Sequence, residues 1–262
     1  MSDKIKGPGM LWVQGNISKA PGNPLTEEQF LRWYDEDHIS EIVETPGIHN
    51  ALRCLHVDKT SPYGTAECPK PFLAFYPMPD LAFTQGAEFK KIRVKSDILP
   101  GTGICYDMAD LDVGYYGFVG KTGSGKEGGW WCSAKYFMVS AIEPADDATD
   151  DEVSKFFDQT ATVSKVEHYQ RSLRFRLLYA RTNAQSRALK GLPTTDEPAP
   201  EPPTWMAVHE FTTEPAADVR NIIGKDTHDV LKKAKQNQIN AYRLDKAQGQ
   251  GKFFEDVDSG AP

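Results

Sequence analysis

The sequence predicts an α+β fold that contains two tandem copies of a βαββαβ unit, and three observations support this prediction. Residues 26–57 and 149–180 align without a gap at an offset of 123. Strand-like segments flank both of them in the same order. The length of 262 residues suits one large domain or two small ones. An internal repeat of this kind constrains the architecture more strongly than local propensities do.

The correspondence between the two segments rests on their pattern, because their sequence identity is low. Acidic, basic and aromatic residues recur at equivalent places, as Trp33 and Phe156 show. The positions identical in both copies are Thr26/Thr149, Asp35/Asp158, Val43/Val166, Glu44/Glu167 and Arg53/Arg176.

The N-terminal copy begins with a strand, since apolar and polar residues alternate between Met10 and Ser18. Thr26 is a typical helix N-cap, and the acidic residues after it suit the first turn of a helix. Pro46 and Gly47 end that helix. We expect strands at 10–18, 48–57, 72–78 and 104–108, and helices at 27–43 and 81–93.

The C-terminal copy repeats these elements, with Thr149 as the corresponding N-cap. A loop rich in Pro, Thr and Glu interrupts it at 191–203, and the tail from Asp256 is expected to be loosely ordered. We expect strands at 130–142, 173–180, 205–212 and 239–244, and helices at 150–167, 216–223 and 227–236.

The order strand, helix, strand, strand, helix, strand is that of the ferredoxin-like unit, and two such sheets in one chain can bury their open faces on each other. The predicted domains are an N-terminal unit at 10–118, a Gly-rich linker at 119–129 and a C-terminal unit at 130–250. The linker contains GKTGSGKE, which is close to a phosphate-binding loop. However, Glu127 stands where that loop needs a hydroxyl group, and no helix follows. We therefore interpret it as a flexible linker.

Composition and charge restrict the possible partners. The 39% hydrophobic fraction, taken with 21 glycines, is that of a globular protein and excludes disorder of the whole chain. A net charge of −7 disfavours nucleic acids and anionic membranes as partners. The N-terminus has no apolar targeting segment, and no stretch is apolar enough to span a membrane. We therefore expect a soluble, cytoplasmic protein.

His38 is the main candidate for chemistry in this sequence. On a regular helix it lies four residues after Tyr34, on the face turned toward the sheet, where a cleft can open. An imidazole there can act as general acid or base, with Asp35 or Asp37 orienting it or raising its pKa. The alternative is a structural histidine that bonds a strand carbonyl and holds the helix in place.

Aromatic residues around His38 have two interpretations. Trp33 and Tyr34 correspond to Phe156 and Phe157 in the second copy, which lacks the histidine, so core packing explains them without a function. Tyr76 and His209 occupy equivalent places on the third strands, and either can present a polar tip to an interior. Tyr76 and His38 form the more economical acid/base pair because both lie in the first copy.

The sequence argues against a metal site or a disulfide framework. His49 and His56 lie on opposite faces of the second strand, because their separation of seven is odd. The cysteines are scattered without a C-x-x-C pair, and we expect them to be small buried side chains; they are Cys54, Cys68, Cys105 and Cys132. We expect no metal and no cofactor.

Residues 30–39 read FLRWYDEDHI, and TPGI at 45–48 and Arg53 follow them. This pattern resembles the EthD-like branch of the dimeric α+β barrel superfamily. The resemblance implies two ferredoxin-like units packed sheet to sheet as an α+β barrel, here in tandem in one chain. Two departures are Ser40, where the family often has proline, and Ala161 in the second copy, at the position of His38 in the first.

Relatives in that superfamily include cofactor-free cyclases, decarboxylases and oxygenases for aromatic or polyketide-like molecules, haem enzymes, and members without assigned chemistry. We find no haem motif around the histidines of this chain. The resemblance therefore favours a cofactor-independent lyase, cyclase or oxygenase that acts on a small apolar aromatic or polyketide-like metabolite, with a homodimer as one possible assembly. The catalytic candidates are His38, Tyr76 and Asp35, and the substrate-binding candidates are Trp33, Tyr34, Asp37 and His209. The alternative is a non-catalytic binding or scaffold protein with the same fold.

Overall fold

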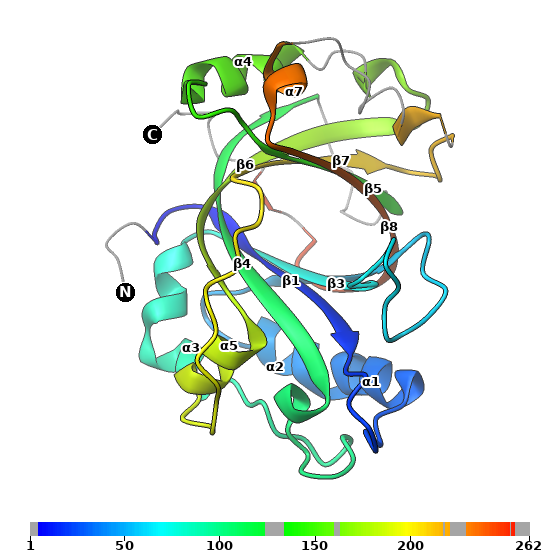
Figure 1. Ribbon diagram of the computed structural model, residues 1–262, viewed down its shortest axis with the longest axis vertical. Helices are drawn as coiled ribbons and strands as arrows, with labels where there is room; N and C mark the ends of the chain where they lie inside the picture. The colour runs from blue at the N-terminus through cyan, green and yellow to red at the C-terminus, as the bar shows by residue number, and fades with distance from the viewer. Residues whose placement is uncertain are drawn as a thin grey trace. The chain divides into compact units, whose positions relative to one another are not determined.

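The computed structural model describes residues 5–123, 134–159, 163–216, 218–220, 229–251 and 253–254. These residues form a mixed α/β structure with a closed antiparallel barrel in the hydrogen-bonded order β1-β3-β2-β8-β5-β7-β6-β4 (Figure 1). The strands are β1 Gly9–Ile17, β2 Asn50–His56, β3 Phe72–Met78, β4 Ala109–Thr122, β5 Tyr136–Glu143, β6 Tyr169–Arg181, β7 Trp205–Phe211 and β8 Gln236–Gly249. The helices are α1 Glu27–Trp33, α2 Ile39–Val43, α3 Ala87–Lys91, α4 Asp150–Gln159, α5 Asn183–Leu189 and α7 Asp229–Lys233.

The chain divides into two compact units, and the longer strands run from one into the other. Unit 1 consists of Met1–Gly117, Leu178–Glu201 and Asp245–Glu255. The described residues of unit 2 lie within Phe118–Leu177 and Pro202–Leu244. Strands β4, β6 and β8 therefore each contribute to both units. The predicted repeat boundaries at 10–118 and 130–250 stay a prediction.

The expected strands at 10–18, 48–57 and 72–78 are present as β1, β2 and β3, within a residue or two at each end. The strand expected at 205–212 is present as β7. Within unit 1, β1 pairs antiparallel with β3 and with β4, and β3 pairs with β2. Helix α5, which follows β6 directly, was not expected, and it proves important for the candidate site.

The final strand of the first half lies later in the chain than expected. Residues Cys105–Asp107 form a 3-10 turn, and β4 begins at Ala109, so the strand prediction for 104–108 is wrong. Gly101 and Gly103, both with positive φ, turn the chain just before it. Residues 109–113 alternate between buried and less buried positions, which is the pattern of a strand.

Strand β4 continues to Thr122, so part of the expected linker is strand, and residues 124–129 lie outside the described residues. Strand β5 begins at Tyr136, later than expected, and 130–133 are also outside the described part. Helix α4 ends at Gln159, before the expected end at 167, and a 3-10 turn occupies Val163–Lys165. Three further positions of the sequence analysis also lie outside the described residues: Cys132, Ala161 and the tail from Asp256.

The helical segment of unit 1, residues 27–43, consists of α1, a π turn and α2, and the sequence did not predict the π turn. Thr26 caps α1 through a capping box with Gln29. Residues Tyr34–His38 then form the π turn, in which the backbone N–H of Ile39 donates to the carbonyl of Tyr34 five residues earlier. The wider turn makes residues five apart neighbours on the helix surface, and such turns are frequent at functional sites.

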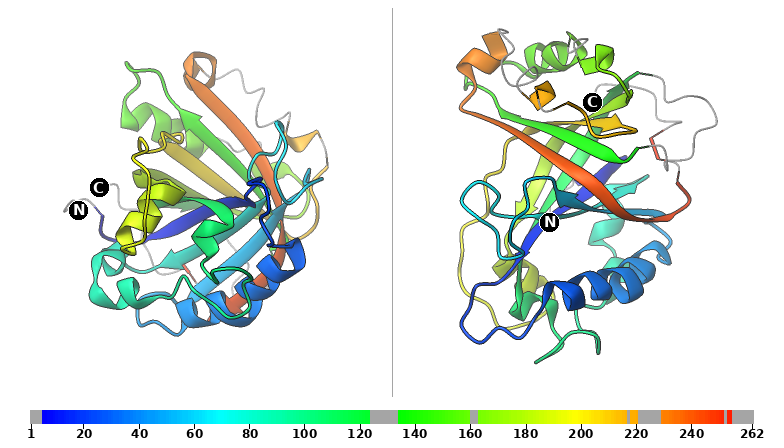
Figure 2. Two further views of the ribbon diagram at one scale, coloured as in Figure 1. Left: turned by 60° about the horizontal axis from the view of Figure 1, so that its bottom comes forward. Right: turned by 90° about the vertical axis from the view of Figure 1, so that its right-hand side faces the viewer.

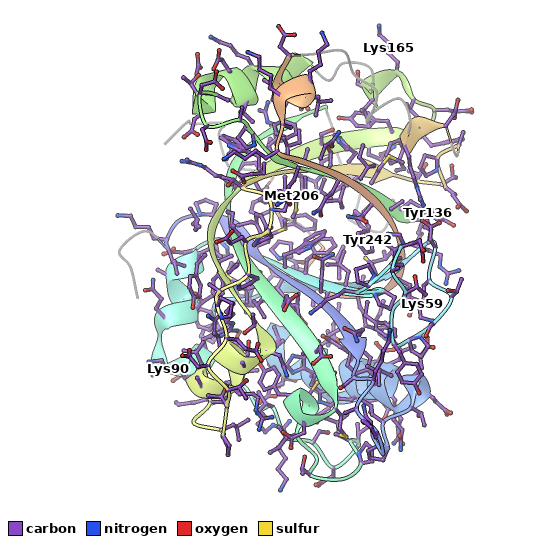
Figure 3. The ribbon with its side chains drawn as sticks, viewed as in Figure 1. Lys59, Lys90, Tyr136, Lys165, Met206 and Tyr242 are labelled. Carbon is purple, nitrogen blue, oxygen red and sulfur yellow. The ribbon has the colours of Figure 1, made fainter. Side chains whose placement is uncertain are left out.

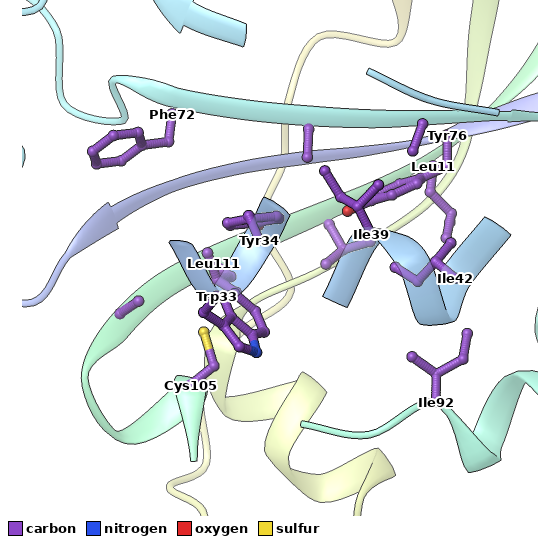
Figure 4. Packing of buried hydrophobic residues seen from close by; sticks show 14 of the residues in the cluster. Leu11, Trp33, Tyr34, Ile39, Ile42, Phe72, Tyr76, Ile92, Cys105 and Leu111 are labelled. Carbon is purple, nitrogen blue, oxygen red and sulfur yellow. The ribbon is translucent and has the colours of Figure 1, made fainter. Parts of the chain in front are cut away.

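The helical segment lies against the strands of unit 1 (Figures 1 and 2), and its buried apolar side chains belong to the same cluster as theirs. The ring centroids of Phe30 and Phe72 are 5.0 Å apart, edge to face. Figure 4 shows Tyr34, Ile39 and Ile42 facing the strands that carry Leu11 and Tyr76. Burying each such large side chain contributes about 1.5–3 kcal/mol, so this contact holds the helix on the sheet.

Unit 2 has apolar clusters of its own. One joins α4 and α7 to strand residues such as Trp205, and another contains Met138 and Phe211. Figure 3 shows Tyr136, Met206 and Tyr242 among the side chains of this unit's strands. Strand β5 pairs antiparallel with β7 and β8, and β6 pairs with β7.

Arg53 links the helical segment to two strands of unit 1. Its side chain is 3% exposed and donates from Nε and Nη2 to the carboxylate of Asp35, at 3.0 and 2.9 Å. Its Nη1 lies 2.6 Å from Oδ2 of Asp245 on β8. A buried guanidinium between two carboxylates satisfies its charge on both sides.

Replacing Arg53 with methionine should lower the free energy of unfolding by about 3 kcal/mol, because two carboxylates lose their common cation. Urea denaturation measures this change. The matched control is Arg32→Met, whose exposed pair with Glu36 should change stability by less than about 0.5 kcal/mol. An Arg53→Met protein as stable as the control would contradict the role given to this ion pair.

Candidate functional site

Unit 1 contains a small apolar cavity beneath the helical segment. Its volume is about 70 Å³, enough for several water molecules or a compact ligand group. Nine of its fifteen lining residues are aliphatic or phenylalanine, for example Leu11, Ile42 and Val113. The six others are polar or aromatic with a polar tip: Tyr34, His38, Tyr76, Tyr106, Arg181 and Lys190. An apolar cavity with a few polar groups is the usual character of a small-molecule site.

The π turn places the imidazole of His38 at this cavity. Its ring stacks on Trp33, with centroids 4.5 Å apart and planes inclined by 19°, and meets the edge of Tyr34 at 5.6 Å. Residues 33 and 38 are five apart, so the π turn is what brings these rings together. The Nδ1 atom is buried and has no hydrogen-bond partner among the described residues.

Burial lowers the pKa of His38 to about 4. The carboxylate of Asp37 acts in the opposite direction, and the cations Lys190 and Arg93 lower the pKa further. Desolvation outweighs the carboxylate, so His38 is a neutral imidazole at pH 7. It can accept a proton or a hydrogen bond there, and it is not an imidazolium acid.

Tyr76 lies on β3 and lines the same cavity. It is 2% exposed, and its hydroxyl also has no hydrogen-bond partner among the described residues. Burial raises the pKa of Tyr76 above its ordinary value, so the phenol is neutral. A buried polar group without any partner costs about 1–3 kcal/mol, so both groups are expected to bond to water or to a ligand in the cavity.

The carboxylates that the sequence offered as partners of His38 are bound to arginines instead. Asp35 accepts both hydrogen bonds from Arg53. Asp37 accepts a hydrogen bond of 2.6 Å from Arg93. Neither of them lines the cavity. The structure therefore gives Asp35 a position in the ion pair that holds the helical segment.

Trp33 and Tyr34, the two aromatic candidates of the helical segment, have different positions relative to the cavity. Trp33 is 3% exposed and belongs to the apolar cluster of unit 1, where it supports the ring of His38 without lining the cavity. Tyr34 belongs to the same cluster and does line the cavity. Burial raises the pKa of Tyr34, and this phenol is neutral as well.

His209 lies on β7 in unit 2, away from the residues that line the cavity of unit 1. Its Nδ1 is 2.7 Å from Oγ of Ser172, and the hydroxyl of Tyr169 is 2.7 Å from that same Oγ. Burial lowers the pKa of His209 to about 4, so it is neutral too. Its Nδ1 belongs to a buried polar network between β6 and β7, whereas its Nε2 is buried without a hydrogen-bond partner among the described residues.

Sequence reasoning missed three cavity residues: Tyr106, Arg181 and Lys190. Tyr106 belongs to the 3-10 turn that was expected to be a strand. Arg181 ends β6, and Lys190 follows α5, in a segment that was assigned to the second copy. No local sequence pattern predicts that these residues line the cavity, because residues 178–201 join unit 1 only through the fold.

Three further properties of the described residues concern metal binding, cysteines and membrane spans. They contain no group of three or more His, Cys, Asp or Glu residues placed to hold a metal ion. Cys54, Cys68 and Cys105 are buried free thiols. Within the described part of the chain, the helices are too short or too polar to cross a membrane.

Comparison with known proteins gives a fold and no family. No family model matches the chain, and no curated protein matches it. Among solved structures, an anthrone oxidase-like protein aligns over 95% of this chain and 96% of its own, with 11% identity and a TM-score of 0.53. A mutant chlorite dismutase from Candidatus Nitrospira defluvii in complex with cyanide aligns over 94% and 96%, with 10% identity and a TM-score of 0.50.

These likenesses show the fold alone. They are consistent with the α+β barrel fold that the sequence predicts. Membership of the EthD-like branch of the dimeric α+β barrel superfamily stays a prediction.

The lowered pKa of His38 predicts an acid-sensitive contribution to stability. Because the pKa is about 4 in the folded protein and about 6.5 in the unfolded chain, the unfolded chain binds the proton first as the pH falls. The contribution is complete above pH 6.5 and is lost down to about pH 4. His38→Gln should therefore lose about 2 kcal/mol less stability than the wild type between pH 7 and pH 5.

Urea unfolding at the two pH values measures this difference. His168→Gln is the matched control, because His168 is exposed, and it should keep the wild-type dependence on pH. The same acid sensitivity in His38→Gln as in the wild type would show that His38 is not held neutral by burial.

Proposed function

We propose that this chain is a cofactor-independent small-molecule enzyme of the lyase, cyclase or oxygenase type. Its substrate is a small apolar aromatic or polyketide-like metabolite bound in the cavity of unit 1. One observation carries the proposal: Nδ1 of His38 and the hydroxyl of Tyr76 are buried without protein partners, and both residues line the same apolar cavity. A bound ligand with a polar group would satisfy both.

The neutral state of the two groups supports a separate role for each. His38, unprotonated at pH 7, accepts a proton from an acidic C–H or O–H group of the substrate. Tyr76 remains a phenol and donates a hydrogen bond to the oxygen on which negative charge develops. The aliphatic lining excludes water from the resulting enolate or phenolate.

This proton abstraction is the step that the three reaction types have in common. A lyase or cyclase then breaks or forms a carbon bond from the anion, whereas an oxygenase uses dioxygen as a second substrate. The name of the anthrone oxidase-like structure makes an aromatic ketone a suitable first substrate to test.

The alternative is a non-catalytic binding protein with the same cavity. A specific observation favours it: a pKa of about 4 makes free His38 a weak base. In this alternative His38 and Tyr76 only bond a polar group of the ligand, and substitutions weaken binding without affecting any turnover.

We also propose that each half of the chain is a ferredoxin-like unit of the EthD-like type. The element orders β1-α1-α2-β2-β3-α3-β4 and β5-α4-β6-α5-β7-α7-β8 support the proposal, since among the helices and strands of the described residues only α5 departs from two βαββαβ sets. The neighbour orders β4-β1-β3-β2 and β8-β5-β7-β6 are equivalent in the two halves and support it further.

Hydrogen–deuterium exchange of an enolisable aromatic ketone in D₂O, followed by NMR, tests the enzyme proposal directly. With anthrone as substrate, the wild type should accelerate exchange above the buffer rate, since exchange reports the proton abstraction itself. His38→Gln should lower that acceleration by about 10²- to 10⁴-fold. Tyr76→Phe should lower it by a smaller factor, because it removes one hydrogen bond and no proton acceptor.

Tyr63→Phe is the matched control for Tyr76→Phe, because Tyr63 is an exposed tyrosine outside the cavity. Full acceleration in His38→Gln would remove His38 from catalysis. Ligand binding without any accelerated exchange in the wild type would favour the binding protein.

A further inference from the structure

Arg181 is a buried cation at the cavity without a protein anion to balance it. It is 7% exposed, and its Nε atom is buried without a hydrogen-bond partner. Among the described residues it forms no ion pair. Its guanidinium carbon lies over the ring of Tyr115, 5.5 Å from the ring centroid. A buried charge is expensive unless it is paired, so this arrangement requires an explanation.

Three other arginines in the described part of the chain have carboxylate partners. Arg53 is held by Asp35 and Asp245. Arg171 pairs with Glu210, and Arg187 pairs with Asp107. In these three cases an acidic residue of the protein neutralises the guanidinium, and Arg181 differs from them in having no such partner among the described residues.

Lys190 adds a second positive charge to the same cavity. Its ammonium group donates to the carbonyls of Lys90 and Ile92, at 2.9 and 2.6 Å, which leaves one of its three N–H groups. These bonds join the end of α5 to α3, which lie side by side in Figure 1, with Lys90 labelled in Figure 3. Burial and the neighbouring Arg181 lower the pKa of Lys190, and the carboxylate of Glu41 acts in the opposite direction.

The cavity therefore has two cations and no acid. Its lining residues include neither Asp nor Glu. Asp37 and Glu41, the nearby carboxylates of the helical segment, are bound by Arg93. A ligand that enters this cavity meets a positive potential at one place and aliphatic walls elsewhere.

We propose that Arg181, supported by Lys190, is an anion-binding site in this cavity, so that the ligand is an apolar molecule carrying one carboxylate, phenolate or enolate group. The inference rests on the proposed function, which makes the cavity a ligand site, and adds the charge of the ligand. The planar guanidinium can bind a carboxylate through two parallel hydrogen bonds. For an enzyme, the same cation would stabilise the anion formed when His38 removes a proton.

Benzoate and benzamide provide the test, because they share size and shape and differ in charge. Titration calorimetry at fixed ionic strength should show benzoate binding at least about tenfold more tightly than benzamide to the wild type, since hydrogen bonds to charged groups are the stronger ones. Chemical-shift changes at the His38 imidazole should place both ligands in the cavity.

Variants of Arg181 attribute the preference to one residue. Arg181→Met should reduce the preference for benzoate to about twofold or less, because it weakens benzoate binding more than benzamide binding, and Arg181→Lys should retain part of the preference. Arg32→Met, at an exposed site, is the control and should behave as wild type. If Arg181→Met does not fold, the Arg181→Lys variant and the wild-type comparison still decide the question.

The outcomes separate this inference from the proposed function. Equal affinities for benzoate and benzamide at the His38 cavity would overturn the anion site and leave the apolar binding site intact. A benzoate preference that survives in Arg181→Met would also overturn the role of Arg181. No binding of either compound and no change at His38 would overturn both proposals.

Discussion

Polar and charged groups that are enclosed by apolar side chains need partners, and unit 1 depends on how this requirement is met. Arg53 meets it within the protein, between Asp35 and Asp245, and thereby fixes the helical segment. His38, Tyr76 and Arg181 do not meet it with any described residue. The first arrangement stabilises the fold, and the second leaves a cavity whose polar groups are free to bind something else.

The π turn is the local feature that brings the imidazole of His38 to this cavity. In a regular helix, Trp33 and His38 would not stack, because side chains five apart do not face each other. With the π turn their rings lie 4.5 Å apart, and the imidazole is held in one orientation at the cavity. A neutral histidine with a fixed ring, in apolar surroundings, is suited to accept a proton or a hydrogen bond.

The sequence predicts the early part of the fold well, because its signals are local. The capping residue Thr26, the alternation in β1 and the Pro46-Gly47 stop are each read from a few neighbouring residues. It also identified His38, Tyr34 and Tyr76 as candidates, and all three line one cavity. Asp35 and Asp37, which were expected to orient His38 or raise its pKa, are bound by Arg53 and Arg93, and Asp37 also acts to raise the pKa of His38. Arg181 and Lys190 are far along the chain from the other cavity residues, so no local sequence pattern could predict that they line the cavity.

The central claim is that the cavity of unit 1 binds a small anionic aromatic molecule. A crystal structure of the protein with 4-bromobenzoate, using the anomalous signal of bromine, tests it most directly. The account predicts bromine within the aliphatic part of the cavity and the carboxylate against the guanidinium of Arg181, near His38 and Tyr76. Bromine found only outside the cavity, with Arg181 and His38 still without a ligand, would contradict the claim.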